Sequence, residues 1–314
     1  MRTPKSALFV VFALLAPALA AAGLEQSLVS GAAAFESALQ TPPKLAVAAL
    51  KDFRAYSDED RLIDLLDDPD PLVRAEAAKS LRRYALTSYR AERALLSALD
   101  RSGEAVSVKK AAAKSLAWAA QHDGTKRELL DLAASRGADA SLRAVAFKSL
   151  YVAAPREYDV QRALKEALND SNEPLAVREA AAWTLWAAHN DYSIRRALMD
   201  AVRESREPVS LRVEAAKSLF GVMNEYDVKN LMKDIARDSN APEALREVAI
   251  LDHLILNNDY STKSMLEDMS RDRSLSVILR SAAIKALGEF SLEAAQYFHL
   301  SHYQGKFIDP LQDQ

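Results

Sequence analysis

Two patterns of apolar residues alternate along the chain, and both have the spacing of an α-helix. In the first, apolar residues recur four positions apart, as at Leu164 and Leu168. In the second they form an i, i+4, i+8 series, as at Val73, Ala77 and Leu81. No window shows the alternation of apolar and polar residues that is typical of a strand between turns. The pattern predicts an all-α protein built from antiparallel helix pairs.

The second pattern repeats at a nearly constant interval of 34 or 35 residues. A basic residue near the start of each second helix recurs at Arg74, Lys109, Arg143, Arg178, Arg212, Arg246 and Arg280. An apolar residue seven positions later recurs at Leu81, Leu116, Leu150, Leu185, Leu219 and Leu287, and His253 takes this position in the sixth copy. A period of this length predicts a solenoid, with seven repeats over residues 57–290.

A column of tyrosines precedes the first helix of most repeats, at Tyr56, Tyr89, Tyr158, Tyr192, Tyr226 and Tyr260. The residues that follow four of these tyrosines are N-cap types, so we expect caps at Asp159, Ser193, Asp227 and Ser261. We also expect each Tyr to be a packing staple ahead of the cap, with its hydroxyl near solvent.

The first copy, Asp68-Pro69-Asp70-Pro71-Leu72-Val73-Arg74 followed by Ala77-Ala78-Lys79-Ser80-Leu81, resembles a HEAT repeat. The resemblance implies a right-handed α-solenoid of about seven HEAT-like helical hairpins with terminal capping helices. It also implies that the second helices line the concave surface, and that an Asp–Arg ladder ties neighbouring repeats together. The tetratricopeptide family, which has a similar period, fits less well because Pro here precedes the second helix and Tyr precedes the first. The acidic residues expected in the ladder lie six to eight positions before the basic column, at Asp68, Asp170, Glu204, Asp238 and Asp272.

The N-terminus has the layout of a secretory signal peptide. Two basic residues precede an uncharged apolar run over residues 7–19, and small residues then give cleavage sites after residue 20 or residue 22. We therefore expect residues 1–20 to be a signal peptide and the mature protein to be periplasmic or secreted, with an uncleaved signal anchor as the alternative. Residues 23–56 and 291–314 are expected to hold the capping helices, the latter with a C-terminal tail.

Composition narrows the function classes. The chain has 314 residues, a formal net charge of −3 and no cysteine. The acidic balance argues against nucleic-acid binding, which requires clustered Lys and Arg. The lack of cysteine removes disulfides, thiolate metal sites, catalytic thiols and a lipoprotein anchor. No cofactor motif is present, because glycine-rich phosphate loops are absent.

An aromatic cluster on the second helices is the candidate binding surface. Helical geometry places its positions facing outward or at the margin of the core. In the third to fifth repeats these positions carry aromatic residues with lysines at the rim: Tyr151, Trp183, Trp186, Phe220, Lys148 and Lys217. Such a patch is typical of a protein- or peptide-binding site, although rings at these positions also fill gaps between repeats.

Two sets of residues remain as candidates for chemistry. Asp252 and His253 interrupt a Ser-Leu pattern, and His299 and His302 have the spacing to share a helix face. We expect the first pair to bond a neighbouring repeat, or the helix register to shift so that Leu254 enters the core. The favoured function is a non-enzymatic exported scaffold that binds a protein or peptide. The alternatives are a cell-envelope module that binds cell-wall polymer or itself, and a metal-assisted enzyme.

Overall fold

The computed structural model describes residues 58–256 and 259–288, and every regular element within these ranges is helical. Apart from Asp58, these residues belong to one unit, Glu59–Gln314. The expected all-α solenoid of stacked helix pairs is confirmed. The predicted signal peptide and the predicted capping helices, residues 1–56 and 291–314, lie outside the described residues.

Seven helix pairs follow one another along the described chain. The first helices of the pairs are α4 (Asp58–Asp64), α7 (Tyr89–Asp100), α9 (Asp123–Ala134), α11 (Tyr158–Asn169), α13 (Tyr192–Arg203), α15 (Tyr226–Arg237) and α17 (Tyr260–Arg271). The second helices are α5 (Pro71–Ser80), α8 (Val106–Ser115), α10 (Ala140–Ser149), α12 (Leu175–Leu185), α14 (Val209–Ser218), α16 (Glu243–Val248) and α18 (Val277–Gly288). Short turns of helix extend several second helices: α6 (Arg82–Ala85), the 3₁₀ turns η2 (Leu116–Gln121), η3 (Trp186–Ala188) and η4 (Phe220–Val222), and the π-turn η5 (Ala249–His253). Two further 3₁₀ turns are η1 (Leu65–Asp67) and η6 (Leu254–Leu256).

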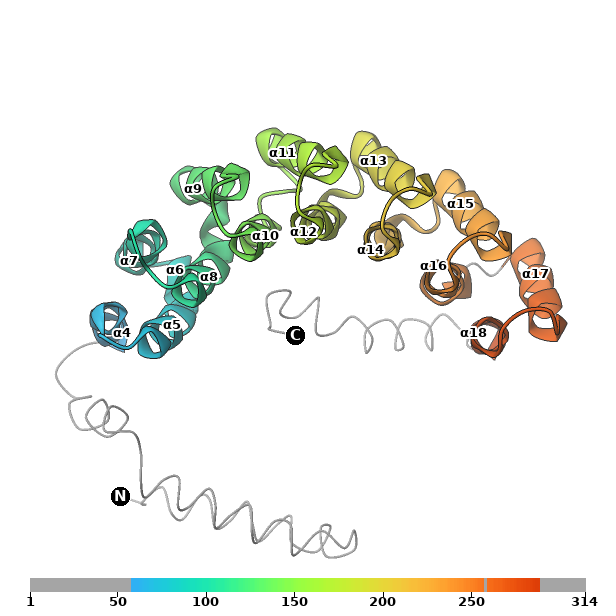
Figure 1. The fold of residues 1–314 in the computed structure, drawn as a ribbon, viewed down its shortest axis with the longest axis horizontal. Helices are drawn as coiled ribbons and strands as arrows, with labels where there is room; N and C mark the ends of the chain where they lie inside the picture. Colours follow the sequence, from blue (N-terminus) through green and yellow to red (C-terminus); the bar gives the residue numbers. More distant parts are fainter. Residues whose placement is uncertain (1–57, 257–258, 289–314) are drawn as a thin grey trace, which may run out of the picture. The chain divides into compact units, whose positions relative to one another are not determined.

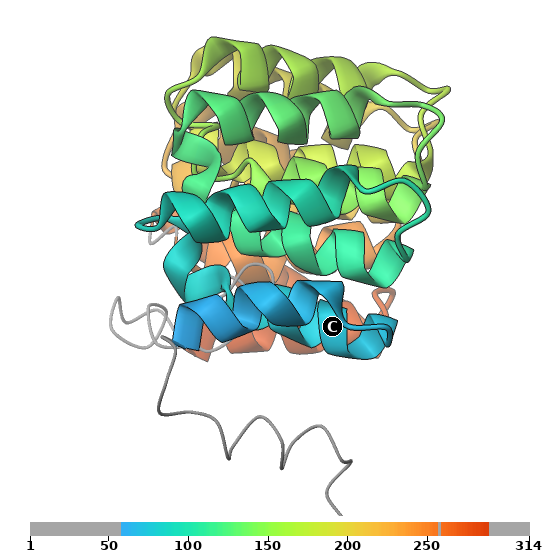
Figure 2. The ribbon, with the colours of Figure 1, turned by 90° about the vertical axis from the view of Figure 1, so that its left-hand side faces the viewer.

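Within this unit the helices form two rows, one of first helices and one of second helices (Figure 1). Helices of both rows run alongside one another in the view turned by 90° (Figure 2). Consecutive second helices pack directly on each other, for example α5 on α8 and α10 on α12. Their contact faces are rich in alanine, which lets helix backbones approach closely. The second helices therefore form the more tightly packed of the two rows.

A continuous apolar core runs between the two rows. The leucine column seven positions after the basic residue is fully buried in the first five repeats, at Leu81, Leu116, Leu150, Leu185 and Leu219. Burying a leucine side chain stabilises a fold by about 1.5–3 kcal/mol. The column therefore supplies a large share of the favourable free energy of stacking. Within the described residues, no helix combines the length and apolar character needed to span a membrane.

The helix caps lie two residues earlier than the sequence pattern predicts. The N-cap residues of α11, α13, α15 and α17 are Glu157, Asp191, Glu225 and Asp259, and the tyrosine that follows each is the first residue of its helix. In α13, for instance, the Asp191 carboxylate accepts hydrogen bonds from the backbone N–H groups of Ser193 and Ile194. The predicted packing role of the tyrosines is wrong, because five of them are 62–88 % exposed: Tyr89, Tyr158, Tyr192, Tyr226 and Tyr260.

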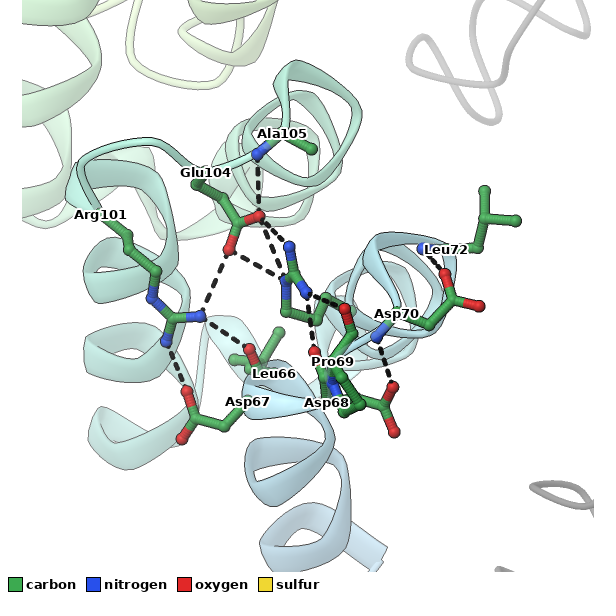
Figure 3. A network of polar contacts seen from close by, with 10 residues as sticks. Leu66, Asp67, Asp68, Pro69, Asp70, Leu72, Arg101, Glu104 and Ala105 are labelled. Carbon is green, nitrogen blue, oxygen red and sulfur yellow. Dashed lines mark hydrogen bonds and ion pairs between the residues drawn. The ribbon is translucent and has the colours of Figure 1, made fainter.

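The basic column forms the expected inter-repeat ladder, but the carboxylates come from different positions. Arg74 donates to Glu104, 30 residues later in the next repeat, at 2.6 Å, and Arg178 pairs in the same way with Glu207. Arg74 also donates to the main-chain carbonyl oxygen of Asp68 rather than to its carboxylate. Figure 3 shows Glu104 and Arg101 meeting in this network. The glutamates win because they reach across to the preceding repeat from the loop before the next second helix.

The ladder has a fixed main-chain component as well. The Nε–H groups of Arg143, Arg178, Arg212 and Arg246 each donate to a carbonyl oxygen ten residues earlier, near the end of the first helix of the same repeat. These carbonyls belong to the last helical turn, where they lack a partner within the helix. One guanidinium therefore caps the first helix of its repeat and, at Arg143 and Arg178, also binds the following repeat.

Candidate functional site

Three aromatic side chains from three consecutive repeats form a continuous row on the second-helix side. Trp118 of η2 meets Tyr151 edge-on at 5.8 Å between ring centroids, and Tyr151 meets Trp183 of α12 edge-on at 6.3 Å. The Lys148 Nζ lies 5.5 Å from the centre of the Trp183 ring. Edge-to-face stacking and cation–π attraction both favour these arrangements. We call Trp118, Tyr151 and Trp183 the aromatic row.

Exposure differs sharply along the aromatic row. Trp118 is 43 % exposed and Tyr151 is half-buried, whereas only 9 % of the Trp183 surface is exposed. Trp183 is therefore at the buried margin that helical geometry allowed, and it serves as the floor on which Tyr151 and Lys148 rest. The part of the row that a partner could touch lies toward Trp118.

The other three predicted site residues are separate from the aromatic row in their printed ring contacts. Trp186 stacks at 6.1 Å on His189, and Phe220 meets His253 at 6.5 Å. A side chain at Gly221 would collide with the His189 ring, so glycine is needed there for the fourth and fifth repeats to pack. Lys217 is half-buried on α14, and no ring contact joins it to the aromatic row in the described part of the chain.

Trp118 is the site residue that the sequence pattern missed. It directly follows Ala117, which occupies the outward column by residue count but is fully buried. The α-helix ends at Ser115, and the chain continues as a 3₁₀ helix. A 3₁₀ helix turns 120° per residue rather than 100°, so a face extrapolated from α8 is misplaced after the helix ends. A rarer residue type, one of three tryptophans in the chain, was the available signal.

A pocket of about 470 Å³ adjoins the exposed end of the aromatic row. Its lining comes from α5, α6, the residue after α6 and η2: Lys79, Ser80, Arg82, Arg83, Leu86 and Trp118. Three of these six side chains are cationic and two are apolar. The pocket therefore combines positive charge with an apolar wall.

The Asp252–His253 anomaly is explained by packing. The π-turn η5 inserts one extra residue, so Leu254, which is fully buried, occupies the leucine column in place of His253. His253 Nε2 lies 2.8 Å from the Ala216 carbonyl oxygen in the previous repeat. Thr184 bonds the Phe147 carbonyl oxygen in the same way, and both partners are 37 residues apart in sequence. Burial lowers the pKa of His253, which keeps the imidazole neutral near pH 7.

The metal candidates do not form a site in the described residues. No group of three or more His, Asp or Glu side chains there is arranged to hold a metal ion. His299 and His302 lie outside the described residues. His122, in the described part, instead contacts the Glu92 carboxylate of the preceding repeat at 3.1 Å.

The described chain is thus a helical-repeat solenoid with an aromatic row on its second helices. No protein-family model matches the sequence, and no curated protein matches it significantly. Similar solved structures include the CpcE–CpcF complex of phycocyanin lyase from Nostoc sp. PCC7120, with 16 % identity, a TM-score of 0.45, and coverage of 76 % of this chain and 98 % of that one. Human deoxyhypusine hydroxylase has 16 % identity and a TM-score of 0.35 over 74 % of this chain and 84 % of that one. An engineered protein has 18 % identity and a TM-score of 0.36 over 75 % and 97 %.

Proposed function

We propose that this protein is an exported, non-enzymatic HEAT-like scaffold that binds a protein or peptide partner through the second-helix surface of its central repeats. The observation that carries the proposal is the aromatic row with its exposed end at Trp118. A large aromatic side chain that is half in solvent beside cationic groups is typical of an interface hot spot. The HEAT-like assignment rests on the first-copy motif and on the inter-repeat arginine ladder.

The non-enzymatic part of the proposal rests on where the polar side chains go. The arginine column and the helix N-caps are engaged in contacts that hold repeats or helix ends together. The one buried acid–base anomaly, at Asp252 and His253, is accounted for by the π-turn. Export rests on the signal-like residues 1–22, so we propose a periplasmic or secreted location and no lipid anchor.

Site-specific photocrosslinking tests the binding proposal. A photoreactive phenylalanine analogue at Trp118 is compared with the same analogue at Ile284, an exposed apolar residue of α18. We expect a defined adduct with a partner polypeptide from position 118, weakened by the Tyr151→Ala substitution, and little from position 284. Equal adducts from both positions, or none from position 118 in the organism's own cells, would contradict the proposal.

A second candidate function is favoured by the exposed tyrosines on the other row of helices. At least five tyrosines begin first helices at one register position, and all are largely exposed. Aromatic faces at regular intervals suit stacking against a repetitive polymer such as a cell-wall glycan. Sedimentation with insoluble peptidoglycan tests this candidate, because the Tyr226→Ala and Tyr260→Ala double variant should then remain in the supernatant.

A further inference from the structure

The pocket beside Trp118 has a charge opposite to that of the chain as a whole. The protein carries a net charge of −3, yet the pocket lining contains Lys79, Arg82 and Arg83 and no carboxylate. The nearest acidic partner on α5 is Glu76, which pairs with Lys79 at 3.3 Å while both side chains are exposed. An exposed pair of this kind is weak and screened by salt. The pocket therefore keeps a positive character.

The positive charge continues from the pocket along the neighbouring second helices. Lys114 on α8 and Lys148 on α10 occupy the same register position as Lys79 on α5. Neither α8 nor α10 contains an acidic residue, whereas α12 and α14 contain Glu179 and Glu214. Because α5 packs on α8 and α8 on α10, these lysines follow one direction across three repeats. The cationic surface is therefore confined to the end of the solenoid that holds the pocket.

The apolar part of the pocket wall adds a second requirement for the ligand. Trp118 and Leu86 are both partly exposed there. An indole at a pocket edge contributes contact area and a π-face, and it is most valuable against an apolar or aromatic group. A volume of about 470 Å³ is within the range of pockets that hold a small ligand or a few side chains. A purely ionic ligand would leave this wall unused.

We infer that the pocket binds an acidic peptide segment of the partner, with an aromatic or apolar side chain against Trp118 and flanking carboxylates on Arg82, Arg83 and Lys114. This inference rests on the proposed function and specifies the chemistry of the partner. Arginine is suited to the task because its guanidinium binds a carboxylate through two parallel hydrogen bonds. A single-stranded nucleic acid also combines negative charge with rings. It is disfavoured because it would bring a long run of phosphates against an acidic protein, whereas a short acidic segment matches the confined cationic surface.

Fluorescence anisotropy with a defined probe tests the inference on the full chain. The probe is a labelled peptide with one Phe flanked by Asp and Glu, and its control has Asn and Gln in place of the acids. We expect the acidic probe to bind, its affinity to fall with added salt, and the amide probe to bind at least about tenfold more weakly.

Matched variants locate the binding. Arg82→Gln together with Arg83→Gln should weaken the acidic probe about tenfold, and Trp118→Ala should weaken it by a similar factor. The control is Arg93→Gln with Arg127→Gln, which removes the same charge from exposed positions of α7 and α9 and should change the affinity less than about twofold. Circular dichroism of each variant checks that the helices remain folded.

Three results would overturn the inference: equal binding of the acidic and amide probes, equal loss in the pocket and control variants, or displacement of the probe by single-stranded oligonucleotide at similar concentration. None of them would remove the proposed function, which stands or falls on partner crosslinking at position 118. If that crosslinking succeeds while the acidic probe does not bind, the partner is recognised by another chemistry. If crosslinking fails while the probe binds, the pocket is a ligand site outside the proposed scaffold function.

Discussion

His253 Nε2 in the sixth repeat lies 2.8 Å from the carbonyl oxygen of Ala216 in the fifth, and this bond is the imidazole's link to the neighbouring repeat. The Ala216 carbonyl belongs to the last turn of α14. The π-turn over Ala249–His253 rotates the imidazole into the place where other repeats carry a small hydroxyl residue. A histidine thus replaces a hydroxyl as the donor between two stacked helices.

The His253→Ala substitution should destabilise the protein by about 2–4 kcal/mol, because it leaves a cavity and an unsatisfied buried carbonyl. His253→Thr should recover part of this loss, since a hydroxyl can donate to the same oxygen. The matched change in the fourth repeat, Thr184→Val, keeps its side-chain shape and should cost about 1 kcal/mol. Urea unfolding followed by circular dichroism measures all three. An alanine variant as stable as the unmodified protein would contradict the structural role.

Removal of Arg74 should lower the urea midpoint substantially, because Glu104 has a side chain only 1 % exposed and would be left buried without its main partner. Burial alone would raise the pKa of Glu104, but hydrogen bonds from Arg74 and from the Ala105 backbone N–H outweigh it and keep the pKa below its ordinary value. The Arg74→Gln, Glu104→Gln double variant should lose less stability than the two single variants together. Additive losses would show that the two side chains do not act as a pair.

Stability should decline in acid through the N-cap of α17. Partial burial of Asp259 opposes its ionisation, but Lys229, Ser261 and Thr262 all bind the carboxylate and hold its pKa well below the ordinary 3.8. A carboxylate with a lowered pKa stabilises the fold above the unfolded-state value, and this contribution is lost as the pH falls below about 4. The Asp259→Asn variant can still accept the cap hydrogen bond but does not titrate. Its urea midpoint should therefore be lower at pH 7 and should fall less on acidification. An unchanged pH profile would contradict this role.

The exposed tyrosines should matter little for stability. Tyr226→Ala should change the free energy of unfolding by less than about 0.5 kcal/mol, because the ring is largely in solvent. Two residues later, Val228 is fully buried, and Val228→Ala should cost about 2 kcal/mol. Thermal and urea unfolding of the two variants provide the comparison. A large loss in the tyrosine variant would mean that the ring packs more closely than its exposure indicates.

The two tryptophans of the aromatic row should respond differently to alanine. Trp183→Ala should destabilise the protein by about 3–5 kcal/mol, since this ring is a buried support. Trp118→Ala should cost about 1 kcal/mol or less and should mainly affect binding. Unfolding and crosslinking measured on the same variants separate the two effects. A larger stability loss at position 118 than at position 183 would reverse the assignment.

The sequence by itself determined the class of fold and the register of its core. The 34-residue recurrence of Arg74 and Leu81 equivalents requires helix pairs that bury one continuous apolar seam, and a helical period leaves little choice of face. It also located most of the aromatic cluster, because Tyr151 and Trp183 occupy columns that can be counted along α-helices.

Only the tertiary structure decided which residues meet across repeats. The ladder partner of Arg74 is Glu104 rather than Asp68, and Trp118 rather than Trp186 joins Tyr151, because both outcomes depend on how one repeat is placed against the next. Helical periodicity describes positions within a single α-helix. It loses its meaning where the chain passes into a 3₁₀ turn after Ser115 or a π-turn before Leu254, since the angle per residue changes there.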